Sequence, residues 1–227
     1  MRTDLESLKQ AASARALDLV RPGMVLALGT GSTARYFTEG LGRMVRDGLQ
    51  VTAVATSEAT AQLALSLGIV TTEEVDRIDL AVDGADEIDP SLNLVKGRGG
   101  ALTREKLVAT VAARFIVVAD ETKLVERLGR GVLPTEVLPF LWRQTGRRLE
   151  ALGATYALRS VAGRPFLTDN GNLILDLTFT QPLTDPSEFA DRISGVAGVV
   201  EHGLFIGLTR ACIVAGREGV RVLGSLD

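Results

Sequence analysis

Acidic and basic side chains gather in one short stretch of the chain, residues 83–106, with the sequence DGADEIDPSLNLVKGRGGALTREK. Asp83 and Asp86 open it, Lys96 precedes a glycine-rich turn, and Glu105 lies at the start of a predicted helix. A carboxylate placed beside a lysine can move a proton between substrate atoms, while the lysine stabilises the negative charge that develops. We therefore consider an acid–base centre first.

A metal site is the main alternative for these carboxylates. Counted from Asp83, they fall at positions 1, 4, 5 and 7, which does not match the 1, 3, 5 and 12 pattern of a calcium loop. His202 is the only histidine and Cys212 the only cysteine, so a zinc site would need mostly carboxylates. A carboxylate site for Mg²⁺ stays open, but no metal is predicted.

A solvated acidic loop is the other alternative. Glu87 and Asp89 flank a turn at Pro90, and we expect both to be solvated turn residues. Asp83 and Asp86 instead follow an apolar strand, at the carboxyl end where open α/β sheets bind ligands. Glu105 has a structural alternative too, because a carboxylate in the first turn of a helix is stabilised by the helix dipole.

A second motif, LGTGSTA at residues 28–34, joins an apolar run to a predicted helix. The glycines allow a tight turn, and free N–H groups at the start of a helix attract a phosphate. The motif is neither a Walker loop nor a full dinucleotide fingerprint, so an ordinary helix cap is the alternative. Thr56 and Ser57 stand at a similar junction, where capping of the next helix is the simpler interpretation.

The elements that position these motifs alternate between strand and helix. Short apolar runs typical of buried parallel strands occur at residues 24–29, 51–56, 79–83 and 114–120, and helical segments lie between them, including residues 101–113. This order predicts a parallel α/β layer. After about residue 128 a hairpin signal at Asn170-Gly171 and a helix from about residue 185 indicate a small α+β domain. Apolar runs at 211–216 and 219–224 are expected to return to the first sheet.

Composition narrows the class of protein. The chain has 227 residues, is 46% hydrophobic and carries a net charge of −3, which disfavours a general nucleic-acid binder. A single cysteine rules out an internal disulfide. The N-terminal segment has no apolar signal region, and no run of 18 apolar residues exists, so a cytoplasmic protein without a membrane span is expected.

Five motifs together resemble the type A ribose-5-phosphate isomerase family along nearly the whole chain: LGTGSTA, TSEAT, DGADEID, KGRGGALTREK and VVADETK. The resemblance implies interconversion of D-ribose 5-phosphate and D-ribulose 5-phosphate through an enediol or enediolate, without metal or organic cofactor. It implies catalytic roles for Glu105 as the base and for Asp83, Asp86 and Lys96. The implied substrate-binding residues are Thr30, Gly31, Ser32, Thr33, Asp83, Gly84, Ala85, Asp86, Lys96, Gly97, Arg98, Gly99, Lys123 and Lys9.

The family often has KGGGAA where this chain has KGRGGA, so Arg98 replaces a glycine. The implied fold is a Rossmann-like parallel-sheet domain, residues 1–128 plus 204–227, with a smaller inserted α+β domain, residues 129–203, as the oligomer contact. A homodimer or tetramer and no nucleic-acid partner are expected. Two rival functions are an amino-sugar isomerase/deaminase, which commonly needs an active-site histidine, and a sugar-phosphate-sensing domain of a regulator, which would need a DNA-binding element.

Overall fold

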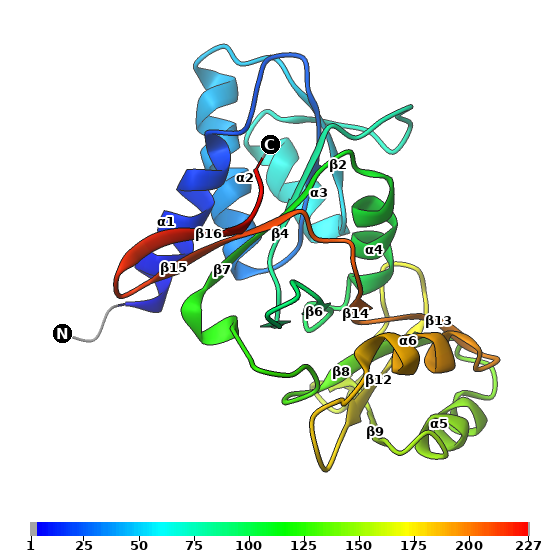
Figure 1. Cartoon of the computed structure of the whole chain (residues 1–227). Coiled ribbons are helices and arrows are strands. Elements are labelled where there is room, and N and C mark those ends of the chain that lie inside the picture. Colours follow the sequence, from blue (N-terminus) through cyan, green and yellow to red (C-terminus); the bar gives the residue numbers. More distant parts are fainter. Residues whose placement is uncertain (1–3, 227) are drawn as a thin grey trace. The chain divides into compact units, whose positions relative to one another are not determined.

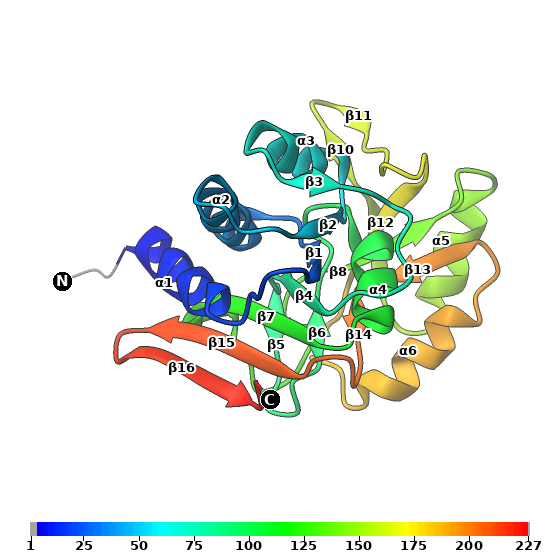
Figure 2. The same ribbon diagram turned by 90° about the horizontal axis from the view of Figure 1, so that it is seen from above.

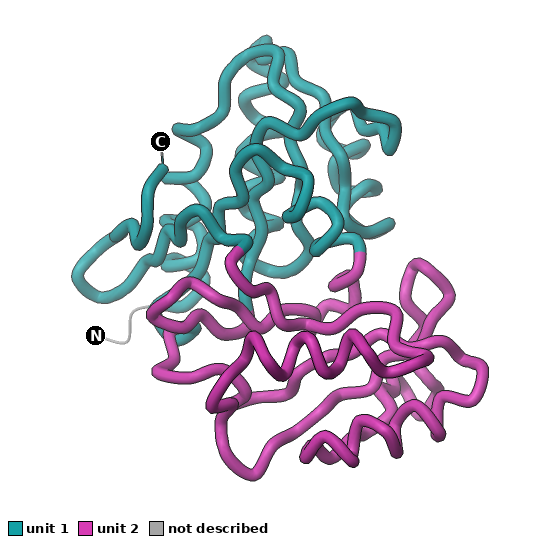
Figure 3. Tube along the Cα trace, turned by 45° about the vertical axis from the view of Figure 1, so that its right-hand side comes forward, with its two compact units in different colours: residues 1–85, 104–123, 208–227 teal, residues 86–103, 124–207 magenta. Residues whose placement is uncertain are grey.

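The computed structural model describes residues 4–226 and divides them into two compact units (Figure 3). Unit 1 comprises the chain up to Ala85, Arg104–Lys123 and the chain from Leu208 on; unit 2 comprises Asp86–Thr103 and Leu124–Gly207. Compared with the predicted division, the second unit also takes in residues 86–103, 124–128 and 204–207. The reason is pairing, because short strands in 86–103 form a sheet with a strand at 204–205.

Unit 1 is built on a seven-stranded sheet with the order β16-β15-β7-β4-β1-β2-β3. All neighbouring pairs are parallel except β15 with β16. The central strands β4 and β7 are buried at every residue, as their continuous apolar sequences predict. The strands are β1 (Val25–Leu28), β2 (Thr52–Ala55), β3 (Val70–Thr71), β4 (Leu80–Asp83), β7 (Phe115–Asp120), β15 (Ala211–Gly216) and β16 (Gly219–Gly224).

Three helices of unit 1 line one side of this sheet: α1 (Leu5–Leu17), α2 (Ser32–Arg46) and α3 (Glu58–Ser66) (Figure 2). Ser57 caps α3 by accepting a hydrogen bond from the Thr60 amide, which confirms the simpler interpretation of that junction. The helix α4 (Leu102–Val111) and the short helix η1 (Glu121–Lys123) follow β6 and β7 respectively. Buried side chains from α1, α2 and the sheet form one hydrophobic core.

Unit 2 contains a four-stranded antiparallel sheet with the order β13-β8-β12-β9, accompanied by α5 (Trp142–Glu150) and α6 (Pro186–Ser194) (Figure 1). Asn170-Gly171 forms a turn and a helix starts after residue 185, both as predicted, and Asp185 caps this helix by accepting a hydrogen bond from the Glu188 amide. Its remaining strands form a three-stranded sheet and a hairpin. The strands are β5 (Glu87–Ile88), β6 (Leu94–Val95), β8 (Leu133–Val137), β9 (Thr155–Leu158), β10 (Ser160–Val161), β11 (Arg164–Pro165), β12 (Leu173–Thr178), β13 (Val199–His202) and β14 (Leu204–Phe205).

The architecture confirms the predicted α/β class: a mostly parallel central sheet with helices, and a smaller α+β unit. The final strand pair, β15 and β16, joins the first sheet as expected. Cys212 is fully buried in β15, as its apolar surroundings suggested. Among residues 4–226, no helix is both long and apolar enough to cross a membrane.

Candidate active site

Four neighbouring parallel strands of unit 1 end at the same edge of its sheet. At that edge Gly29 follows β1, Thr56 follows β2, Asp83 ends β4 and Asp120 ends β7. Ligands of open α/β sheets bind outside the carboxyl ends of the strands. The sheet topology therefore brings LGTGSTA, TSEAT and the start of DGADEID to one edge of the sheet, as their positions after the strands indicated.

The loop after β1 leads directly into α2. Gly31 takes the N-cap position with φ of 123°, a backbone conformation that favours glycine. No side-chain cap bonds the first turn of α2 within the described chain, so its amides are directed at the loop. Ser13 of α1 donates a hydrogen bond to the Thr33 carbonyl at 2.9 Å, which ties the loop to α1. This geometry suits an anion at the start of α2.

The side chain of Asp83 lies against this loop. It is only 3% exposed, and its Oδ1 accepts a hydrogen bond from the Gly84 amide at 2.7 Å. A Cβ added at Gly29 would come within 2.1 Å of Asp83 Oδ1, so the glycine makes room for the carboxylate. A Cβ at Gly84 would lie 3.9 Å from Thr33 Cβ. The acidic loop and the glycine-rich loop are thus adjacent in unit 1.

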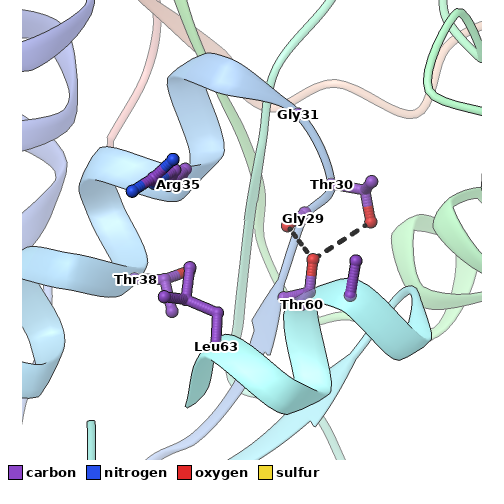
Figure 4. Close-up of a pocket in the computed structure, with 8 residues that line it drawn as sticks. Gly29, Thr30, Gly31, Arg35, Thr38, Thr60 and Leu63 are labelled. Atoms are coloured by element: carbon purple, nitrogen blue, oxygen red, sulfur yellow. Dashed lines mark hydrogen bonds between the residues drawn. The ribbon is translucent and has the colours of Figure 1, made fainter. Parts of the chain in front are cut away.

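A cavity of about 290 Å³ opens beside the same loop (Figure 4). The N-terminal parts of α2 and α3 form its walls. The hydroxyls of Thr30 and Thr60 point toward one another beside Gly29. Arg35 lies on α2 and pairs with Glu39 at 2.7 Å, which raises the pKa of the exposed guanidinium. The lining residues are Gly29, Thr30, Gly31, Arg35, Thr38, Ala59, Thr60 and Leu63.

The remaining predicted residues of unit 1 come from three other elements. Glu105 lies in the first turn of α4 and is 4% exposed. Lys123 ends η1, a helix held by Asp120, which accepts from the Thr122 amide at 3.0 Å. Lys9 on α1 forms an ion pair with Glu6 at 2.7 Å. Ala85, the last residue of the acidic loop that belongs to unit 1, is partly exposed.

Lys96 follows β6 in unit 2 and is 3% exposed. Its amide donates to the Gly203 carbonyl at 2.8 Å, and its Nζ lies 5.5 Å from the centroid of the Phe205 ring. An aromatic face attracts a cation at this distance and partly offsets the cost of its burial. The structure therefore holds the Lys96 amine in a buried position, where a charge would act strongly.

Asp86 and Arg98 meet in unit 2. The Arg98 amide donates to Asp86 Oδ2 at 3.1 Å, and its Nε lies 3.7 Å from Asp86 Oδ1. Gly97 to Gly100 form a turn closed by a 3.0 Å hydrogen bond, with Arg98 and Gly99 in the two central positions. Among the described residues, the non-glycine residues with positive φ do not include Arg98. The turn therefore accepts a side chain where the family often has glycine.

Glu87 contradicts its prediction. It was expected to be a solvated turn residue, but it is 4% exposed, and its carboxylate accepts hydrogen bonds from the amides of Gly129, Arg130 and Gly131. Burial is possible because three N–H donors replace water around the charge. Asp89 is a turn residue as expected, accepting from the amides of Ser91 and Asn93.

Two other sequence features have structural explanations. His202 is buried in unit 2, where its Nε2 lies 3.1 Å from Ser194 Oγ and its Nδ1 accepts from the Leu204 amide at 3.2 Å. Both ring nitrogens are thus engaged in holding β13 to its surroundings. Within residues 4–226, no group of three or more histidine, cysteine or acidic side chains is arranged to hold a metal ion.

Sequence reasoning missed the role of the TSEAT segment beside the loop. The hydroxyls of Thr56, Ser57 and Thr60 converge on Thr30, at 2.8, 2.8 and 3.3 Å. Capping of α3 explains the hydroxyl of Ser57, but not those of Thr56 and Thr60. The signal that was present is the clustering of three hydroxyl residues after a strand that pairs with β1, since adjacent parallel strands end side by side.

Comparison with known proteins places this chain in a family. A family model described as ribose 5-phosphate isomerase A (phosphoriboisomerase A) matches residues 52–219. Proteins named ribose-5-phosphate isomerase A from Nitrobacter hamburgensis and Gloeobacter violaceus are both 51% identical to the chain. The alignments cover 96% of this chain and 98% of the first relative, and 97% of this chain and 97% of the second.

Solved structures give the same answer. A ribose 5-phosphate isomerase from Plasmodium falciparum superposes with a TM-score of 0.93 at 39% identity, covering 98% of this chain and 100% of that one. A D-ribose-5-phosphate isomerase solved in complex with phospho-erythronic acid superposes with a TM-score of 0.94 at 40% identity, with the same coverage. Sequence and fold thus agree over nearly the whole length, and this chain belongs to the ribose 5-phosphate isomerase A family.

Proposed function

We propose that Glu105 is the base that moves the proton when this enzyme interconverts D-ribose 5-phosphate and D-ribulose 5-phosphate. The isomerisation transfers a proton between C2 and C1, and one carboxylate can remove it and return it to the neighbouring carbon. Glu105 carries the proposal, because it is a buried carboxylate in the first turn of α4, within the motif KGRGGALTREK. Burial keeps competing water away from such a base.

The enediolate intermediate carries negative charge on O1 and O2, and the proposal assigns Lys96 to that charge. Its ammonium is buried, so little water screens it. Fixed donors for a developing oxyanion are worth about 3–4 kcal/mol in other enzymes. The amides of Gly97 and Gly99 in the Gly97–Gly100 turn are proposed as further donors, and Arg159 stabilises this turn by donating to the carbonyls of Gly97 and Arg98.

Asp83 and Asp86 are proposed to bind sugar hydroxyls, and one of them assists ring opening. Both carboxylates are oriented by backbone amides, Asp83 by Gly84 and Asp86 by Arg98. A carboxylate that is already oriented loses little conformational entropy when it accepts from a substrate hydroxyl. Both carboxylates are therefore proposed to accept hydrogen bonds from hydroxyls of the pentose, in its ring form or its open-chain form.

The phosphate is proposed to bind at the start of α2, with Gly31, Ser32 and Thr33 supplying donors and Lys123 and Lys9 supplying charge. The uncapped first turn of α2 supports this assignment. A related D-ribose-5-phosphate isomerase was solved in complex with phospho-erythronic acid, a compound that carries a phosphate and a carboxylate and can serve as a competitor in binding tests. Phosphate binding remote from the reacting carbons can be used to orient them.

The decisive experiment replaces the base. In Glu105→Gln the side chain keeps its shape but cannot take up a proton, so kcat should fall by at least about 10³-fold while substrate still binds. Turnover is followed by ketose formation, and binding by competition with phospho-erythronic acid. Deuterium from heavy water should enter the wild-type product at the reacting carbon. A variant that keeps more than about a tenth of kcat would remove Glu105 from this role.

Two further proposals concern the setting of the enzyme. We expect it to act in the cytoplasm, and unit 2 to contribute the contact of a homodimer or tetramer. The exposed apolar side chains of Leu138, Phe140 and Leu141 after β8 support a contact there. Light scattering of the wild type and of Phe140→Ser would test it: a monomeric wild type would contradict the proposal.

A further inference from the structure

Four hydroxyl groups in unit 1 form a connected cluster around the loop after β1. Thr30 Oγ1 lies 2.8 Å from Thr56 Oγ1 and 2.8 Å from Ser57 Oγ. Ser57 Oγ lies 3.0 Å from Thr60 Oγ1, which in turn lies 3.2 Å from the Gly29 carbonyl oxygen. Figure 4 shows the Thr60 hydroxyl between Gly29 and Thr30. Thr56, Ser57 and Thr60 are all buried.

The carbonyl of Gly29 sets the direction of these hydrogen bonds. A hydroxyl has one proton to donate, and a carbonyl oxygen can only accept. Thr60 therefore donates to Gly29, Ser57 donates to Thr60, and Thr30 donates to Ser57. Ser57 Oγ also accepts from the Thr60 amide at 3.1 Å, which is its role as the cap of α3.

Thr56 lies next to the Thr30 end of this chain of hydroxyls. Its hydroxyl lies 2.8 Å from Thr30 Oγ1 and 3.0 Å from the Leu28 carbonyl. Because a carbonyl oxygen can only accept, Thr56 donates its proton to Leu28, which also accepts from the Thr56 amide at 3.1 Å. The Thr56 oxygen is thus a second neighbour of the Thr30 hydroxyl and does not take the Thr30 proton away from Ser57. Chains of hydrogen bonds in which each member donates once polarise and strengthen one another.

This arrangement decides what Thr30 can offer to a ligand. Its only proton is committed to Ser57. The lone pairs of its oxygen can only accept a hydrogen bond. A phosphate dianion has acceptors and no donors, so it gains nothing from this side chain, whereas a sugar hydroxyl can donate to it.

We propose that Thr30 binds a hydroxyl of the sugar rather than the phosphate, and that Ser57 and Thr60 are positioning residues that give Thr30 this polarity. The phosphate is then left to the amides of the first turn of α2 and the hydroxyls of Ser32 and Thr33. This inference rests on the proposed function and divides the loop of residues 30–33 into a sugar-facing residue and phosphate-facing residues.

The first test separates sugar from phosphate recognition with inorganic phosphate as a competitive inhibitor. Thr30→Val keeps the shape of the side chain and removes its acceptor, so the KM for ribose 5-phosphate should rise about tenfold, the equivalent of one net hydrogen bond. The Ki of inorganic phosphate should change less than twofold. Ser32→Ala should raise both constants. Equal increases in the phosphate Ki for Thr30→Val and Ser32→Ala would overturn the inference.

The second test asks whether Ser57 acts through Thr30. Ser57→Ala releases the Thr30 proton and should raise KM about threefold to tenfold in the wild-type background, but less than twofold in the Thr30→Val background. Ser66→Ala is the matched control on the same helix, because Ser66 donates only to the Leu63 carbonyl at 2.7 Å and is exposed. It should leave KM unchanged.

A merely structural role predicts a different result. Loss of the α3 cap would raise KM by the same factor in both backgrounds, and that outcome would overturn the positioning role. Thr60→Val provides a second variant that keeps the Ser57 cap, with the same pattern expected. Failure of this inference is distinct from failure of the proposed function, because the latter is measured as kcat of Glu105→Gln and the former as KM and phosphate Ki.

Discussion

Gly29 and Asp83 occupy adjoining space in unit 1, so that a Cβ at position 29 would lie 2.1 Å from Asp83 Oδ1. Real Cβ atoms do not approach another heavy atom so closely. Asp83 is 3% exposed and has little room to move away. The strands β1 and β4 pair in parallel, so their ends lie side by side. The carboxylate at the end of β4 therefore requires a glycine directly after β1.

We therefore expect Gly29→Ala to displace the Asp83 carboxylate. The variant should lose about 1–3 kcal/mol of unfolding free energy through overpacking. Its kcat/KM should fall about 100-fold, because a carboxylate moved by about 1 Å no longer holds the substrate correctly. Urea denaturation and steady-state kinetics measure the two effects. Gly195→Ala is the control, because its added Cβ would make only ordinary contacts at 3.6 Å or more. A wild-type kcat/KM for Gly29→Ala would contradict the prediction.

Glu87 should contribute to stability rather than to chemistry. Glu87→Leu removes the acceptor of three backbone amides, that of Gly129 buried and those of Arg130 and Gly131 partly buried, and a donor left buried without an acceptor costs about 1–3 kcal/mol. We expect a loss of at least about 3 kcal/mol in unfolding free energy, measured by urea denaturation. Glu126→Leu, at an exposed position of the same unit, should change stability by less than about 0.5 kcal/mol. Equal effects of the two substitutions would show that the amides are satisfied without Glu87.

Arg98 should tolerate reversion to glycine, although it lies in the loop next to Lys96. Its backbone does not need a positive φ, and the 3.7 Å pair with Asp86 involves a side chain that is 48% exposed, so the pair is worth less than about 1 kcal/mol. We expect Arg98→Gly to change KM less than about threefold.

Gly100→Ala is the contrasting variant in the same turn. Gly100 has φ of 84°, and an added Cβ would lie 2.5 Å from the Phe166 ring, so the variant should lose about 2 kcal/mol or more of unfolding free energy. The two variants are compared by thermal unfolding and by KM. An Arg98→Gly variant with a much larger KM would show that the guanidinium itself touches the substrate.

Lys9 should control the ionisation of Glu6. The hydrogen bonds from Lys9 and then from Tyr36 hold the pKa of Glu6 below its ordinary value. This contribution to folding is present above the pKa of the unfolded chain and is lost as pH falls through the lower folded pKa. Lys9→Met should raise the Glu6 pKa, as followed by NMR titration of its carboxyl carbon. Arg15→Met removes the ion pair between Arg15 and Asp18 and should leave the Glu6 pKa unchanged. A Glu6 pKa that does not move in Lys9→Met would contradict the role given to Lys9.

Isomerase activity should persist in excess EDTA. In the proposed mechanism, lysine ammonium groups and backbone amides stabilise the negative charge of the substrate. A chelator therefore removes no group that the mechanism requires. Ketose formation is measured after dialysis against EDTA and again after addition of MgCl₂, with equal rates expected. A rate that falls under EDTA and returns with Mg²⁺ would restore the metal alternative for the acidic loop.

Local sequence determined the order of the elements and the position of most motifs. Buried parallel strands have continuous apolar sequences, and the glycine, hydroxyl and carboxylate residues follow them directly, as at Gly29 and Asp83. Several strands were missed, and β8 shows why: it contains Pro134, which lacks an N–H donor and usually marks a break, yet it lies inside a four-stranded sheet. Its carbonyl accepts from the Gly203 amide at 2.7 Å, a partner that sequence alone does not reveal.

The motifs in the sequence were sufficient to identify the family, because glycine, hydroxyl and charged residues occur in them at fixed spacing. Only the tertiary structure decided which hydroxyl donates to which, because the direction of the Thr30 hydrogen bonds depends on Ser57 and Thr60, which belong to a neighbouring strand-to-helix junction. It also decided that Glu87 is buried, since its amide partners lie about forty residues away. Burial and hydrogen-bond direction depend on residues that meet through folding, and local sequence carries no record of those distances.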